Sequence, residues 1–354
     1  MSIPSLLLAA ALAADPVEVA TINTEADTVS EVVYSHDGSA MYCVLRRGYE
    51  SSIVRFDLST GNEEWRHSDE AGTFGAIAVD LRNEFVAVVR RKHRTLGHGP
   101  IEIRASGTGA VVSEVAAPPD DLEAARHLWF VDAGRGVVGV GTLGDVVHVD
   151  WRSGKLRKIG FEFAEGEGGS VVHKCALSRE LDVIAVGATS GFIRFVPFGD
   201  REFAPSIGKP GYVVPLSLAG FPISAVAFAE DRSEFLMVAR WPRQDRGEQR
   251  SLWAYHELIR FKIDGRSVVE EERVELPFQV ARMHYMDDQD AVVLVTGERR
   301  PKICVWSLKS MSLLGSLRLE ECSLTSVAYN SAVNEIAIGT REGQIVRIGL
   351  AVEE

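Results

Sequence analysis

The last stretch of the chain, residues 323–350 (SLTSVAYNSAVNEIAIGTREGQIVRIGL), contains the pattern that most restricts the fold. It holds three short runs rich in β-branched residues, which are Ser326–Tyr329, Glu335–Ile338 and Gln344–Ile348. A polar turn separates the first two runs, and glycines bracket the turn between the second and the third. Short runs of this composition, broken by turn residues, predict three antiparallel strands.

The same pattern recurs along the whole chain. A bulky residue closes the first run of each copy, at Tyr34, Val79, Phe130, Leu177, Phe228, Tyr285 and Tyr329. Equivalent positions in the third run are 42 to 48 residues apart, except for one interval of 67 residues whose excess we assign to a single loop. A period of about 40–45 residues is typical of the four-stranded blades of a β-propeller. The sequence therefore predicts seven copies of one β unit.

The two ends of the chain are predicted to share one blade. We name the four strands of a copy a to d in chain order. Six copies have a candidate d strand, but the seventh stops at Glu354 without one. Pro16–Asn23 (PVEVATIN) alternates like a strand and precedes the first copy, so it can complete the last blade and remove the open edges of the ring. We predict an all-β fold, with one seven-bladed propeller of four-stranded antiparallel blades over residues 15–354.

Four motifs give the chain a resemblance to a divergent branch of the WD40 superfamily, of WD40-like or YVTN type. They are Gly141–Asp145 before Val146–Val149, Gly187–Gly191 before Phe192–Phe195, Gly339–Gly343 before Ile345–Ile348, and Ile303–Trp306. No blade starts with Gly-His and no third strand ends in Trp-Asp, so the usual Asp-His-Ser/Thr-Trp hydrogen-bond network is not carried over. Apolar contacts are expected to dominate blade packing instead. The resemblance implies a non-enzymatic scaffold or adaptor that presents loops to protein partners.

Composition excludes several classes of function. Apolar residues make up 46% of the chain, and the net charge is −12. An acidic protein lacks the basic footprint that nucleic-acid or membrane-surface binding requires, so neither partner is expected. The four cysteines, Cys43, Cys175, Cys304 and Cys322, are too far apart for metal-ligand spacing and are expected to be buried in a reducing compartment.

The N-terminal residues 1–14 form a separate apolar segment. Ser5–Ala14 (SLLLAAALAA) has the apolar character of a signal peptide, but no Lys or Arg precedes it. It is also shorter than the roughly 20 residues that span a bilayer, so no integral membrane span is expected. We favour a tail or short helix and a cytoplasmic protein. A cleaved signal peptide, giving a periplasmic or secreted binding propeller, is the alternative.

The loops between strands b and c are expected on one face of the ring, together with the d–a connections. The b–c loops together contain 14 Lys and Arg against 7 Asp and Glu, and all 14 basic residues lie in blades 5, 6, 7, 1 and 2, which are consecutive around the ring. We predict that this basic arc docks a protein partner with an acidic or phosphorylated surface, with aromatic residues of the insertion Arg240–Glu257 as anchors. The candidate docking residues are Arg46, Arg47, Arg90, Arg91, Lys92, Arg94, Trp241, Arg243, Arg246, Arg250, Trp253, Tyr255, Arg299 and Arg300.

A plainer interpretation of the same loops stays open. Acidic d–a connections such as Asp69-Glu70 and Asp120–Glu123 share this face and would neutralise the arc, which leaves an ordinary solvated surface. The insertion aromatics are equally explained by packing onto their own blade.

The a strands are expected to line a central channel. Equivalent positions there place Glu31, His127, Lys174 and Arg282 in one ring, with His284 on the same strand as Arg282. A propeller hydrolase or lactonase, which is the alternative function, needs several convergent carboxylates or histidines at such positions. One Glu and one His among two cations favour a structural ring in which the polar groups satisfy one another. No catalytic residue, cofactor or metal is therefore expected.

Overall fold

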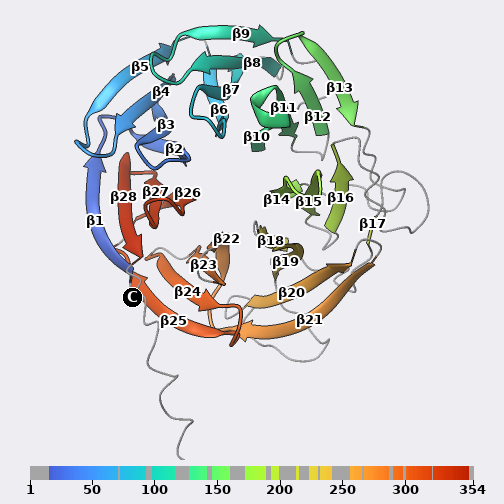
Figure 1. Cartoon of the computed structure of the whole chain (residues 1–354). Helices are drawn as coiled ribbons and strands as arrows, with labels where there is room; N and C mark the ends of the chain where they lie inside the picture. The colour runs from blue at the N-terminus through green and yellow to red at the C-terminus, as the bar shows by residue number, and fades with distance from the viewer. Residues whose placement is uncertain are drawn as a thin grey trace, which may run out of the picture.

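A computed structural model shows seven four-stranded antiparallel sheets arranged as the blades of one ring (Figure 1). The structure describes residues 16–70, 72–92, 98–116, 127–141, 146–159, 172–188, 193–198, 213–214, 223–229, 232–240, 256–264, 267–286, 290–297, 300–320 and 322–350. The predicted N-terminal segment 1–14 lies outside these residues, and its boundary stays a prediction. Within them, no helix has the length and apolar character needed to cross a bilayer.

Each blade runs from its a strand at the centre to its d strand at the rim (Figure 1). The a strands of blades 1 to 7 are β2 (Thr28–Tyr34), β6 (Gly72–Val79), β10 (His127–Val131), β14 (Val172–Ser178), β18 (Ile223–Ala229), β22 (Val280–Met286) and β26 (Leu324–Asn330). The b strands are β3 (Ala40–Arg47), β7 (Phe85–Lys92), β11 (Gly136–Val140), β15 (Val183–Ala188), β19 (Arg232–Arg240), β23 (Ala291–Thr296) and β27 (Glu335–Thr340).

The outer half of each blade is built in the same way. The c strands are β4 (Glu50–Asp57), β8 (His98–Ala105), β12 (Val146–Asp150), β16 (Ile193–Pro197), β20 (His256–Asp264), β24 (Lys302–Ser307) and β28 (Gln344–Leu350). The d strands are β5 (Glu63–Asp69), β9 (Val111–Val115), β13 (Lys155–Ile159), β17 (Val213–Val214), β21 (Ser267–Leu276), β25 (Ser312–Arg318) and, for blade 7, β1 (Pro16–Asn23). A 3-10 turn, η1 (Asp132–Gly134), joins β10 to β11.

The predicted seven-bladed fold is confirmed, and so is its closure. β1 pairs antiparallel with β28 from Pro16 opposite Leu350 to Asn23 opposite Gln344. The chain after β1 then lies against the β27–β28 turn, where Thr24 N–H donates to the carbonyl of Gly343 at 3.1 Å. Gly343 has a φ of +73°, and a Cβ at this position would lie 1.9 Å from the carbonyl oxygen of Ala26. Glycine is therefore required where the two ends of the chain meet.

The extra length of the long repeat is divided between two stretches, which corrects the prediction of a single loop. One stretch is 241–255, because Arg240 and Glu257, the predicted ends of the insertion, belong to β19 and β20. The other stretch separates β16 from β18 and contains the two-residue strand β17. Periodicity alone cannot distinguish these two places, since both lie between the same pair of c strands.

The hydrophobic core is distributed over the junctions between blades. The described residues form seven apolar clusters, and each takes side chains from two neighbouring blades. At the junction of blades 1 and 2, for example, Tyr42 and Ile53 pack with Phe74 and Val86. Because both faces of each sheet are covered in this way, the b strands read as nearly continuous apolar runs.

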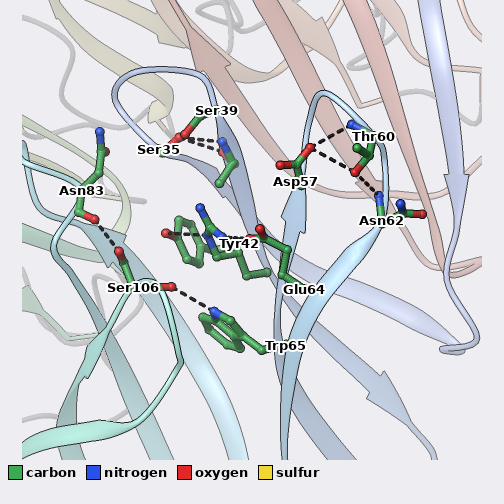
Figure 2. A network of polar contacts seen from close by, with 12 residues as sticks. Ser35, Ser39, Tyr42, Asp57, Thr60, Asn62, Glu64, Trp65, Asn83 and Ser106 are labelled. Carbon is green, nitrogen blue, oxygen red and sulfur yellow. Dashed lines mark hydrogen bonds and ion pairs between the residues drawn. The ribbon is translucent and has the colours of Figure 1, made fainter.

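Polar contacts also join the blades, through one repeated backbone acceptor. At five junctions, a side chain donates a hydrogen bond to the carbonyl of the residue that follows the c strand of the next blade. The pairs are Trp65 Nε1 to Ser106 (2.9 Å), Ser113 Oγ to Trp151 (3.2 Å), Arg157 to Phe198 (2.5 Å), Arg260 to Leu308 (2.7 Å) and Arg347 to Leu58 (3.3 Å). Figure 2 shows the first pair, with the Trp65 indole directed at Ser106 and Tyr42 beside it. Blade packing is therefore less purely apolar than the missing WD40 network implied.

Removal of β1 tests the closure of the ring. Deleting residues 1–23 should leave β28 as an exposed edge in blade 7, with a row of unpaired backbone N–H and C=O groups. We expect the truncated protein to lose its single cooperative unfolding transition and to aggregate, as measured by scanning calorimetry and size-exclusion chromatography. Deletion of residues 1–14 alone is the matched control and should leave both measurements unchanged. Identical melting of the 1–23 deletion and the full chain would contradict the role of β1.

Candidate functional site

The a strands of all seven blades line a central channel with a cavity of about 840 Å³. Every residue of the predicted ring, together with His284, lies in its wall. The ring residues also lie at the same height along the channel axis, because each pairs with the equivalent position of its b strand. The pairs are Glu31 with Val44, His127 with Val140, Lys174 with Gly187 and Arg282 with Val295. The structure thus brings together side chains that are far apart in the sequence.

β-Bulges fix this level in several blades. In β2, β14, β18, β22 and β26 the pairing register shifts immediately before the ring position, so one residue of the a strand is extra. Three of these extra residues carry hydroxyls that donate to b-strand carbonyls, which are Ser30 to Val44 (3.1 Å), Ser224 to Ala239 (3.0 Å) and Thr325 to Gly339 (2.7 Å). A bulge re-aims the neighbouring side chain, and the hydroxyl bond holds that geometry.

Backbone and ring contacts hold the polar groups of the channel in place. The Arg282 guanidinium donates to the carbonyls of Ala281 (2.9 Å) and Thr325 (3.1 Å). His127 stacks on Trp129, with ring centroids 5.6 Å apart and planes at 11°. Carbonyl acceptors orient the Arg282 head group but leave its formal charge in place.

His284 is neutral at physiological pH. Burial is the main cause that lowers the pKa of its imidazole to about 4, and the positive charges of Arg282 and Lys174 lower it further. Its Nε2 atom is buried and has no hydrogen-bond partner among the described residues. The low pKa of His284 therefore follows mainly from burial, and a backbone hydrogen bond with Val327 offsets part of the lowering.

Two cations of the channel wall were not part of the predicted ring. Arg46, at the end of β3, was assigned only to the basic arc, and Arg179 follows β14 directly. In the sequence, the only indication that Arg179 lines the channel is its position directly after the a strand. A residue at that position can also point to solvent. Among the described residues, Glu31 is the only carboxylate of the channel wall, and no group of three or more His, Cys, Asp or Glu has metal-binding geometry.

The turn between β3 and β4 presents two exposed side chains on the b–c loop face. Arg47 is exposed, and Tyr49 has 85% of its surface accessible, the most of any exposed large hydrophobic side chain in the described part of the chain. The Gly48 N–H between them donates to Asp27 Oδ2 at 2.7 Å, which fixes the turn. Tyr49 was not among the predicted docking residues, although it stands next to Arg46 and Arg47 in the same loop. Arg300, in blade 6, is exposed as well.

Arg90 belongs to a mostly buried ion network. Its Nε lies 2.5 Å from Asp69 Oδ2, and its guanidinium lies 3.5 Å from the Glu102 carboxylate, which also binds Arg104 at 2.5 Å. The hydrogen bond to Asp69 is the main cause that raises the pKa of Arg90. Asp69 belongs to an acidic d–a connection. At Arg90, therefore, an acidic residue of the same face neutralises a basic residue of the arc, as the plainer interpretation expects.

The rest of the predicted docking arc is not covered by the structure. Outside the described residues lie Arg94, Trp241, Arg243, Arg246, Arg250, Trp253, Tyr255 and Arg299, and the side chains of Arg91 and Lys92 are not described either. Docking on this arc stays a prediction.

Comparison with known proteins supports the fold. The crystal structure of the β-propeller domain of Cps50 (Swd1) from Myceliophteria thermophila superposes with a TM-score of 0.71 over 95% of this chain and all of that one, at 12% sequence identity. No protein-family model and no curated protein sequence gave a significant match. The likeness supports the β-propeller fold alone and leaves function to be argued from the surface and the channel.

A buried histidine at the junction of blades 5 and 6 makes stability depend on pH. His256 is 1% exposed, and its Nδ1 accepts the Val280 N–H at 2.9 Å, while burial lowers the pKa of its imidazole to about 4 from the usual 6.5. Between these two values the unfolded chain binds a proton that the folded protein excludes, so the free energy of unfolding falls as the pH falls. The loss reaches up to about 3 kcal/mol near pH 4.

The substitution His256→Asn tests this effect. The amide oxygen of asparagine can accept the hydrogen bond from Val280 N–H, and the amide does not titrate. Ser51 Oγ already accepts Phe74 N–H in this way at the equivalent place in blade 1, at 3.1 Å. We expect urea unfolding between pH 7 and pH 4 to show a smaller loss of stability for the variant than for the natural protein. The remaining loss reports His284 together with carboxyl groups whose pKa is lowered in the folded protein, such as Asp57 and Glu342. Equal slopes for the two proteins would contradict the assignment.

Proposed function

We propose that the protein is a non-enzymatic interaction scaffold that docks a protein partner with an acidic or phosphorylated surface on its b–c loop face. The observation that carries this proposal is Tyr49, a largely exposed aromatic side chain beside the exposed Arg47. Tyr and Arg are enriched among the residues that dominate binding at protein interfaces.

The charge of this face supports an acidic partner. The chain as a whole carries a net charge of −12, but its b–c loops together carry twice as many basic as acidic residues, and the basic ones lie in five consecutive blades. Positive charge at the rim of an interface chiefly accelerates encounter with a negative partner, whereas a buried aromatic anchor slows dissociation. In this proposal Arg47 and Arg300 accelerate encounter with the partner, and Tyr49 slows its dissociation.

The channel wall supports a protein without catalytic activity. Hydrolytic mechanisms need an acid and a base, or a ligand set for a metal, within reach of one reacting bond. Among the described residues of the wall, Glu31 is the only carboxylate, and burial, together with the charge of Arg282 and Lys174, lowers the pKa of His284 to about 4. The cytoplasmic location likewise stays a proposal, in keeping with four free cysteines, of which Cys43, Cys304 and Cys322 are buried.

Charge reversal on the b–c loop face tests the docking proposal. A native partner is first identified by affinity purification from the source organism with mass spectrometry, and its binding kinetics are then measured at low and high salt. Arg47→Glu with Arg300→Glu should slow association by about tenfold at low salt, and Tyr49→Ala should accelerate dissociation. Both variants should melt like the natural protein, since exposed substitutions usually change stability by less than about 0.5 kcal/mol.

The matched control carries the same change on the opposite face. Arg82→Glu with Lys309→Glu reverses two exposed cations, one on an a–b turn and one on a c–d turn. This control should bind the partner at the natural rate. If it impairs binding while the Arg47 and Arg300 reversals do not, the partner docks on the other face and the proposal is wrong.

The non-enzymatic part of the proposal has its own test. The protein purified from its native source should contain no stoichiometric divalent metal by elemental analysis. Glu31→Ala and His127→Ala should change melting behaviour and abolish no hydrolase or lactonase activity, because their role is to satisfy polar groups in the channel wall. A stoichiometric metal that is lost in either variant would overturn this part and favour the hydrolase alternative.

A further inference from the structure

The outer strand of blade 3, β13, differs from the outer strands of the other blades. In five blades the d strand has one extra residue opposite its c strand, so the pairing register shifts there. These extra residues are Val19 in β1, Glu64 in β5, Val112 in β9, Glu271 in β21 and Leu314 in β25. The described d strand of blade 4, β17, has only two residues. β13 instead pairs regularly along its whole length, from Asp150 opposite Lys155 to Val146 opposite Ile159.

A regular outer strand is an open site for a further strand. Figure 1 shows β13 at the rim of the ring, and within the described part of the chain it is the last strand of its sheet. Such a strand offers a row of unpaired backbone N–H and C=O groups, with which an extended segment can pair. A β-bulge or a very short strand interrupts this row, and therefore blocks an approaching strand of any sequence.

Positive charge is what protects β13. Arg152, Lys155, Arg157 and Lys158 are all exposed, and Asp150 is the one acidic residue between positions 150 and 159. The Asp150 carboxylate accepts two backbone N–H groups of the c–d turn, at 3.1 and 3.2 Å. Like charges opposite each other on paired strands are destabilising, so these side chains disfavour pairing of β13 with another copy of itself.

The basic side chains of β13 project from both faces of blade 3. Leu156 packs against the apolar cluster between blades 2 and 3, and Ile159 packs against the cluster between blades 3 and 4. Alternation along the strand therefore turns Lys158 toward blade 2, and Lys155 and Arg157 toward blade 4. A strand added at this edge would meet positive charge on each of its two faces.

We propose that β13 accepts an extended acidic segment of a partner protein as a fifth strand of blade 3. Backbone hydrogen bonds supply the affinity in this mode of recognition, and side chains on the added strand supply the specificity. Carboxylates opposite the basic side chains of β13 would stabilise the pair. A bulge excludes every strand, whereas a basic edge excludes neutral and basic strands and favours acidic ones. The charge that keeps copies of this protein apart thus selects the partner.

This surface is separate from the b–c loop face, because it lies along the outer edge of a single blade. Strand addition at β13 requires neither Tyr49 nor Arg47, so Tyr49→Ala should leave it unchanged. The two proposals can therefore fail independently of each other.

The probe is a synthetic heptapeptide with blocked ends, in which glutamate alternates with valine. A matched peptide of lysine and valine tests the charge, and an N-methylated copy of the acidic peptide, which lacks backbone donors, tests strand pairing. By titration calorimetry, the full-length protein should bind the acidic peptide saturably and the other two about tenfold more weakly or less. Hydrogen exchange in residues 155–159 should slow when the acidic peptide is bound, because an added strand protects the outward amides.

The variant Lys155→Glu with Lys158→Glu should reverse the preference. It should weaken binding of the acidic peptide by about tenfold and allow the lysine peptide to bind, since the cross-strand pairs change sign. Arg157 is left unchanged because its guanidinium donates to the carbonyl of Phe198 in blade 4, at 2.5 Å.

The matched control is Arg82→Glu with Lys309→Glu, which changes the net charge equally at exposed positions away from β13. It should bind the acidic peptide like the natural protein. The proposal is overturned if the N-methylated and unmodified acidic peptides bind equally, if exchange in residues 155–159 does not slow, or if both double variants bind alike. The peptide comparison uses only the natural protein, so it is decisive even where a variant does not fold. Dimerisation that is lost in Lys155→Glu with Lys158→Glu would also overturn the proposal, because a second copy would then occupy the edge.

Discussion

The face-to-face packing of neighbouring blades is the constraint on which the rest of the structure depends. Each blade is one four-stranded sheet, and the seven apolar clusters that the described residues form all lie between neighbouring sheets. A sheet with two apolar faces is stable only when both are covered. The bonds from Trp65, Ser113, Arg157, Arg260 and Arg347 to the backbone of the next blade fix the relative rotation of the sheets. Stability is therefore a property of the ring, and the channel inherits its shape from these junctions.

The sequence was sufficient for the fold because blade structure follows from local patterns. The positions from Tyr34 to Tyr329 were aligned by alternation and turn residues, and in the structure they occupy the same place in every a strand, as Tyr34 opposite Met41 and Tyr329 opposite Ile336 show. The pairing of Pro16–Asn23 with the last blade followed from counting strands. The same alignment placed Glu31 and Arg282 at one level of the channel, because residues in register on equivalent strands must share a height.

The sequence was insufficient where an interaction is not tied to a residue type. The inter-blade acceptor is a backbone carbonyl, which any residue supplies, and its donors are Trp, Ser and Arg in different blades. His256 and Ser51 perform one task with unrelated side chains. The network of Arg90 with Asp69 and Glu102 joins three strands, so no spacing in the chain reveals it. The loop composition predicted a basic face, but ion pairs such as that of Arg90 with Asp69 decide which of its basic side chains can contact a partner.

The sharing of one blade between β1 and β28 has a consequence for synthesis of the protein in the cell. β1 is the first of the described strands to be translated, and β28, the strand it pairs with, is the last of them. At about 5–20 residues per second, β1 waits roughly 15–65 s for its partner. During that time each finished blade exposes an apolar face until the next one arrives, and the nascent ring carries an open edge at its growing end. The ring can therefore close only once β28 has been made, so the protein reaches its final stability in one late step.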